Sequence, residues 1–336
     1  AVVSWSVLGQ KQRRSLIAVA FHSHQDSLRC GIFALGGWDE ATSLALAAEG
    51  KVPTSDVLED LGRKLAIDAL VEGLPERITK LALVAAPEVA SIPIHALPAR
   101  YSKEGGGSSL LLCDVFDVRY ASSVAALFAV DKRRIESGPK SLLPARYGAC
   151  VLPKEPVPPR LKLLESAFRA GWESGGGSVV STSPPENTAA ERSVLRRADG
   201  VALLDRGGVV VGGKIVEALR FGGPSSVVLV PFVATTSDVD ALLRAGAGTV
   251  VAPLWDAPKP IDDNGRGALC RALLLLAFWR KVAREPDRKV AAPLRDAAAW
   301  LRKATVQDAR DLVAAALGDD DDDDDAAKLR FQRAFR

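Results

Sequence analysis

The stretch that decides the fold is PSSVVLVPFVATTSDVDALLRAGAGTVVAPLWD, residues 224–256. Within it, residues 226–230 form a short, continuous apolar run that is rich in β-branched side chains and lies between Pro224 and Pro231. A run of this length and composition is typical of a strand that is buried on both faces of a parallel sheet. This pattern predicts an α/β fold.

The rest of the stretch completes one β-α-β unit. Residues 238–245 carry apolar side chains at helical spacing and stop at Gly246, and residues 249–252 repeat the pattern of a buried strand. In such units, ligands and catalytic groups sit in the loop after the first strand, which here spans residues 231–237.

Two segments resemble the CHAT domain, a family of cysteine peptidases related to caspases and separases. The family pattern VVLSAC, a helix ending in AGA and then SVVxSLW is similar to VVLVPF, AGA and TVVAPLW in this chain. Upstream, the family pattern ADVVHLATHG is similar to ADGVALLDRG at residues 198–207. The resemblance covers residues 15–305 and implies a caspase-like, mostly parallel sheet flanked by helices, preceded by a related non-catalytic α/β half.

The resemblance also places the two catalytic positions of the family, which are a His and a Cys. They fall on Arg206 and Phe232, while the family's Gly is retained as Gly207. An arginine stays protonated and cannot act as a general base, and a phenyl ring cannot form a thiolate. We therefore expect no catalytic residue at either position and an inactive, pseudopeptidase-like site.

The candidate cleft is formed by residues on three loops. These loops follow the strand that leads to Asp205, the strand at residues 226–230 and the strand at residues 249–252. These residues are Asp205, Arg206, Gly207, Pro231, Phe232, Thr235, Thr236 and Trp255. The expected partner is a protein or peptide, including helical repeats of the same or another chain, because tetratricopeptide repeats often accompany the family. The expected function is a protein-interaction or scaffold module of a larger protein.

Two other interpretations stay open. A working hydrolase could use Thr235, Thr236 or Ser237 as a shifted nucleophile, with Asp205 as the nearest acidic group. Alternatively, the pattern could belong to a generic doubly wound sheet with another ligand. No G-x-G-x-x-G or P-loop spacing supports a nucleotide, so we expect no cofactor.

Composition narrows the class of partner. Lys and Arg number 44 and Asp and Glu 41, so no excess of basic charge predicts nucleic-acid binding. None of the four cysteines is paired in a C-x-x-C motif, which favours free thiols in a reducing compartment and a cytoplasmic protein. No apolar run is long enough to span a membrane, and we expect neither membrane nor metal binding.

The chain is expected to have two halves. We predict an N-terminal half over residues 1–130, a polar linker with two prolines over residues 131–145, and a caspase-like half over residues 146–318. Residues 319–336 hold seven consecutive aspartates, for which we expect a solvated loop, and then a basic tail.

Three features of the first half can be predicted locally. Residues 15–20 and 28–35 flank a polar turn and indicate a β-hairpin, and residues 56–71 have the spacing of one helix. His95 lies in the family-like motif PEVASIPIHAL, residues 87–97, where we expect a packed or hydrogen-bonded core histidine.

Overall fold

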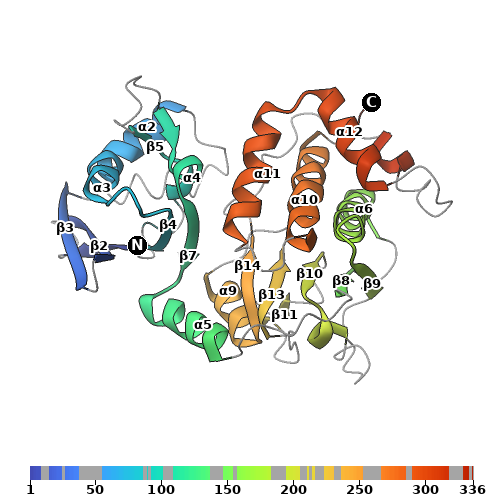
Figure 1. Ribbon diagram of the computed structural model, residues 1–336, viewed down its shortest axis with the longest axis horizontal. Helices are drawn as coiled ribbons and strands as arrows, with labels where there is room; N and C mark the ends of the chain where they lie inside the picture. The colour runs from blue at the N-terminus through green and yellow to red at the C-terminus, as the bar shows by residue number, and fades with distance from the viewer. Residues whose placement is uncertain are drawn as a thin grey trace. The chain divides into compact units, whose positions relative to one another are not determined.

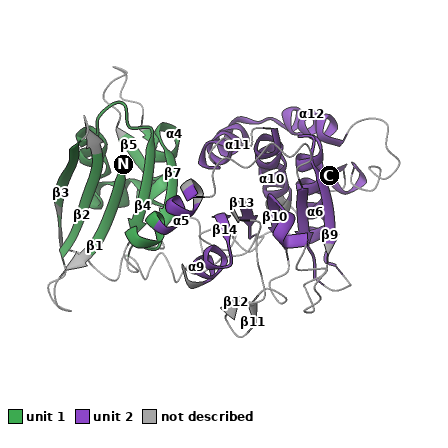
Figure 2. Ribbon diagram, turned by 60° about the horizontal axis from the view of Figure 1, so that its bottom comes forward, with its two compact units in different colours: residues 1–128 green, residues 129–336 purple. Residues whose placement is uncertain are grey.

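The chain forms two compact α/β units, residues 1–128 and 129–336 (Figure 2). The computed structural model describes residues 1–8, 15–24, 27–37, 55–85, 89, 92–100, 109–136, 147–153, 157–182, 194–204, 210–211, 214–215, 223–230, 236–252, 266–284, 290–317, 328–332 and 335. The division between the units falls within helix α5 (Val124–Glu136). Residues 131–136 of the expected linker are therefore helical, and residues 137–145 lie outside the described part.

Unit 1 is built on a mixed five-stranded sheet with the order β3-β2-β1-β4-β7. Its strands are β1 (Val2–Leu8), β2 (Ser15–His24), β3 (Ser27–Gly37), β4 (Lys80–Ala85) and β7 (Asp117–Ala121). β1 and β3 are antiparallel to β2, whereas β4 is parallel to both β1 and β7. The antiparallel β2–β3 pair confirms the predicted hairpin.

Two helices, α2 (Ser55–Lys64) and α3 (Ile67–Gly73), stand where the sequence predicted one, so the prediction of a continuous helix was wrong. The chain breaks at Ala66, which has a left-handed φ of 48°. Leu65 and Ile67 are both fully buried in the core of unit 1. In one continuous helix these two side chains would point in nearly opposite directions, so the break lets both reach the core.

Short elements complete unit 1. They are a 3-10 turn, η1 (Ile94–Ala96), a two-stranded pair of β5 (Pro98–Arg100) and β6 (Ser109–Leu111), and α4 (Leu112–Val115).

Unit 2 contains an all-parallel five-stranded sheet with the order β14-β13-β10-β8-β9. The strands are β8 (Tyr147–Val151), β9 (Ser178–Thr182), β10 (Gly200–Leu203), β13 (Gly223–Leu229) and β14 (Ala247–Val251). A small antiparallel pair, β11 (Val210–Val211) and β12 (Lys214–Ile215), follows β10. The two strands predicted from the opening stretch are β13 and β14.

Helices cover both faces of this sheet, as Figure 1 shows. They are α6 (Pro159–Glu173), α9 (Thr236–Arg244), α10 (Arg266–Arg284), α11 (Ala291–Lys303) and α12 (Val306–Leu317). On one face, Cys150, Ala202 and Leu229 join the core with α6 and α10. On the other, Val201 and Val228 pack with Leu242 of α9. This double burial explains why every residue of β10 is buried.

The basic tail at the end of the chain belongs to unit 2 and contributes to its core. Residues 328–332 are helical, and Phe331 is only 1% exposed within the core that α6 and α10 form. The guanidinium of Arg330 donates a hydrogen bond of 2.8 Å to Ser166 Oγ on α6. α12, which the sequence analysis did not predict, also contributes Val313 and Leu317 to this core. The aspartate run lies outside the described residues.

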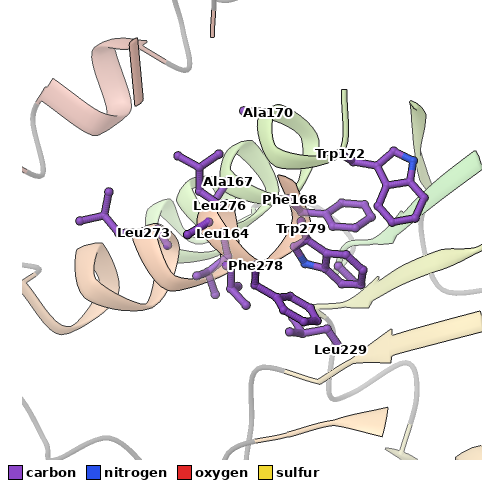
Figure 3. Packing of buried hydrophobic residues seen from close by; sticks show 14 of the residues in the cluster. Leu164, Ala167, Phe168, Ala170, Trp172, Leu229, Leu273, Leu276, Phe278 and Trp279 are labelled. Carbon is purple, nitrogen blue, oxygen red and sulfur yellow. The ribbon is translucent and has the colours of Figure 1, made fainter. Parts of the chain in front are cut away.

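An aromatic cluster holds α6 and α10 against the sheet (Figure 3). Trp279 of α10 contacts Trp172 and Phe168 of α6 edge to face, with ring centroids 5.5 and 4.9 Å apart. A methyl group at Gly200 of β10 would overlap the Trp172 ring and lie 2.7 Å from its Cη2 atom. Glycine is therefore required where the indole meets the strand.

We expect Gly200→Ala to destabilise unit 2 by about 3 kcal/mol, because a rigid ring and a strand backbone cannot separate cheaply. The same substitution in a Trp172→Leu background should cost much less, since the smaller side chain leaves room for the methyl group. Denaturant unfolding of the four proteins of this double-mutant cycle measures the coupling. Equal costs in both backgrounds would contradict the packing described here.

Candidate functional site

The candidate site lies at the carboxyl ends of β10 and β13. These strands are adjacent and parallel, with Gly200 opposite Val227 and Ala202 opposite Leu229. The last described residue after each strand is buried, and its backbone N–H donates a hydrogen bond to the neighbouring strand on the other side. Leu204 N–H donates to Val151 O at 2.9 Å, and Val230 N–H donates to Val251 O at 2.8 Å. The sheet therefore fixes the starting points of both loops at one edge.

Each position that matches the family dyad follows one of these anchors by two residues. Arg206 comes after Leu204, and Phe232 comes after Val230. Thr236 is the first residue of α9, which starts at the same edge. The remaining predicted cleft residues lie outside the described part of the chain: Asp205, Arg206, Gly207, Pro231, Phe232, Thr235 and Trp255.

The point at which the strand order reverses lies between β8 and β10, and such points commonly bind ligands in parallel sheets. Here the loop after β8 leads into α6, whose amino end holds Pro158 and Pro159. Proline has no N–H, and the amides of Leu161 and Lys162 both donate to Pro158 O. The amino end of α6 thus offers few donors to a phosphate group.

Cys150 of β8 is the thiol that lies nearest in sequence to this edge, but its environment suits a structural role. Its side chain is fully buried, and this desolvation raises the pKa of the thiol well above its ordinary value. The nearby Glu165 carboxylate acts in the same direction. A thiol that stays protonated is a poor nucleophile, so Cys150 is not a candidate nucleophile.

A polar network beside Cys150 joins the edge strand β9 to α6. Ser181 Oγ donates to Glu165 Oε1 at 2.6 Å and accepts from Arg169 Nη2 at 3.1 Å. Arg169 also donates to Glu173 Oε1 and to the carbonyl of Val179. Each of these bonds crosses between α6 and β9 or stays within α6, and the network therefore stabilises the fold.

The structure confirms His95 as a hydrogen-bonded core histidine and gives it a partner that the sequence analysis missed. Tyr120 Oη accepts from the His95 backbone N–H at 3.0 Å and lies 2.9 Å from His95 Nδ1. The two rings meet edge to face, with centroids 5.7 Å apart. Since the hydroxyl already accepts the amide proton, its own proton is placed to be donated to a neutral His95 ring.

The polar atoms of this half-buried pair are partly desolvated. Burial lowers the pKa of His95 to about 4 and raises the pKa of Tyr120. Tyr120 as a whole is 39% exposed, so its hydroxyl end, which contacts His95, is the shielded part. Cys113 on α4 lies close enough to act electrostatically on Tyr120. Among the described residues, no group of three His, Cys, Asp or Glu side chains could hold a metal ion.

Comparisons with known proteins give little further constraint. No family model and no curated protein matches the chain. Among solved structures, an NAD(P)H:quinone oxidoreductase from Methanothermobacter marburgensis matches 43% of this chain and 98% of its own, with 14% sequence identity and a TM-score of 0.27. This likeness is too weak to carry an argument about function. In the described part of the chain, no helix has the length and apolar character needed to cross a membrane.

Unit 1 should lose stability as the pH falls from about 6.5 to about 4. The pKa of His95 is depressed in the folded chain, so the unfolded chain binds the proton first. The loss should be at most about 3 kcal/mol. Hydrogen exchange of β4 and β7 across this pH range measures it.

The matched variant is His95→Gln, which cannot take up a proton but can still accept a hydrogen bond. We expect a flatter dependence on pH for this variant than for the wild-type chain. If both proteins lose the same stability over this range, His95 is not the group responsible.

Proposed function

We propose that this chain is a CHAT-like pseudopeptidase that binds a protein or peptide and does not cleave it. The observation that carries the proposal is the adjacency of β10 and β13, which anchors the loops of Arg206 and Phe232 at one sheet edge. In the family that the sequence resembles, these two positions hold the catalytic His and Cys. Here neither side chain can supply a base or a thiolate.

The chemistry of Arg206 and Phe232, which stand at these two positions, suits the binding of a peptide. An arginine can hold a carboxylate through two parallel hydrogen bonds, and a phenyl ring can bury an apolar side chain. No histidine occurs anywhere in residues 129–336, and the fully buried Cys150 is protonated. These facts favour a peptide-binding cleft over a cysteine peptidase. The parent protein would use this cleft for a partner loop or for helical repeats of the same or another chain.

Restoring the dyad tests the alignment on which the proposal depends. We expect the thiol of an Arg206→His/Phe232→Cys chain to react with iodoacetamide roughly ten-fold faster than that of Arg206→Ala/Phe232→Cys at mildly acidic pH. A neighbouring imidazolium lowers the pKa of a thiol and so raises the thiolate fraction. Mass spectrometry that resolves each labelled cysteine gives the rates. Equal rates would contradict the pairing of these two positions.

The wild-type chain should not hydrolyse peptides, and a peptidyl chloromethyl ketone should label no cysteine specifically. Hydrolysis that is abolished by Thr236→Ala would instead support a shifted hydroxyl nucleophile at the start of α9. Binding is measured separately, by titrating the chain with a peptide library and comparing Arg206→Ala. Loss of binding in that variant, without loss of fold, is the expected result.

A further inference from the structure

Strand β3 is the outermost strand in the described sheet of unit 1. The sheet order places it next to β2 alone, and Figure 2 shows it at the edge of that sheet. It is 11 residues long, with the sequence SLRCGIFALGG. An edge strand of this length presents a row of backbone donors and acceptors that can pair with another strand.

Residues 27–30 of β3 are all exposed, and the positions that face the core begin further along the strand. Phe33 and Leu35 pack against the core of unit 1. On the opposite face, Leu28 and Ile32 are 75% and 72% exposed, and Cys30 between them is also exposed. The exposed face of the strand is therefore apolar at three alternate positions, which is costly in water.

From Ser27 to Ala34, β3 lacks the features that normally keep an edge strand from pairing, and its register with β2 shifts only beyond Ala34. It contains no proline, no lysine and no acidic residue, and Arg29 is its single charged side chain. Natural edge strands are usually short or carry inward-pointing charges, prolines or bulges that twist them away. A long edge without such features favours an association through that edge.

We propose that two copies of this chain pair through β3, antiparallel about a two-fold axis at Cys30. In this register Leu28 of one copy lies opposite Ile32 of the second copy, so the two most exposed apolar side chains cover each other. Arg29 lies opposite Gly31, which keeps the two positive charges apart. The strand is thus complementary to itself, as a two-fold contact requires. The inference does not depend on the proposed function.

The register makes a specific geometric prediction. The two Cys30 residues would be directly opposite, with Cα atoms about 4.5–5.5 Å apart. This separation lies within the range that a disulfide can bridge. Diamide, which takes two electrons and two protons from a pair of thiols, should therefore join two full chains through Cys30.

Light scattering and cross-linking on the full chain test the proposal. We expect a mass of about 71 kDa, which is twice the 35.5 kDa of one chain. In a Cys270→Ser background, which removes the other exposed cysteine, diamide should give a covalent dimer that Cys30→Ala abolishes. A wild-type chain that stays at the mass of one copy overturns the proposal.

Ile32→Lys is the variant that should separate the copies. It should weaken dimerisation roughly ten-fold or more while leaving the fold intact, because the residue is exposed in each copy. The matched control is Val306→Lys on α12, where the side chain is 60% exposed and belongs to unit 2; it should remain a dimer. A dimer that survives Ile32→Lys unchanged, or a covalent dimer that does not contain Cys30, would contradict pairing through β3.

Discussion

The contact of Trp172 with the strands beneath it is the constraint on which unit 2 depends. Gly148 and Gly200 face each other on β8 and β10, and the indole of Trp172 lies against both. A Cβ at Gly148 would come within 3.1 Å of the ring, and one at Gly200 would overlap it. Because glycine has no side chain at either position, α6 can approach the sheet closely. Gly171 on the same helix leaves room for the Leu276 carbonyl and Trp279 of α10 in turn.

This close packing also orders the carboxyl edge of the sheet. β10, one of the strands against which Trp172 lies, runs toward the loop that holds Arg206, and its neighbour β13 runs toward the loop that holds Phe232. Because β10 is buried on both faces and paired on both sides, its carboxyl end has little freedom. A binding edge that is anchored by such strands can tolerate changes of residue type in the loops while the architecture remains. This is the physical basis on which a catalytic site can be lost without loss of the fold.

The strands of unit 2 could be predicted because a doubly buried parallel strand leaves a local signal, a short run of β-branched residues. Residues 226–230 carried that signal and became most of β13. Other features of the fold depend on contacts between residues that are far apart in the sequence. Ala66 breaks a regular helical pattern because Leu65 and Ile67 are both drawn into the core, and Phe331 lies in a core formed by residues far from it in sequence. No local sequence pattern predicts the break at Ala66 or the burial of Phe331.

The candidate site likewise has one part that the sequence predicts and one part that depends on contacts distant in sequence. The residue types at positions 206 and 232 could be read from the sequence, and they exclude a His–Cys pair directly. Bringing their loops to one edge depends on the register of β10 and β13, which only the sheet order supplies. The Tyr120 partner of His95 lies 25 residues away and could not be found from spacing.

The most direct test of the central claim is a distance between positions 206 and 232. With Arg206→Cys and Phe232→Cys in one chain, a short bifunctional thiol reagent such as dibromobimane should join the two positions within that chain. A control pair of Arg206→Cys with Val306→Cys should not be joined. If the first pair fails to cross-link in folded protein, the two loops do not meet at one edge, and the assignment of a lost catalytic dyad is wrong.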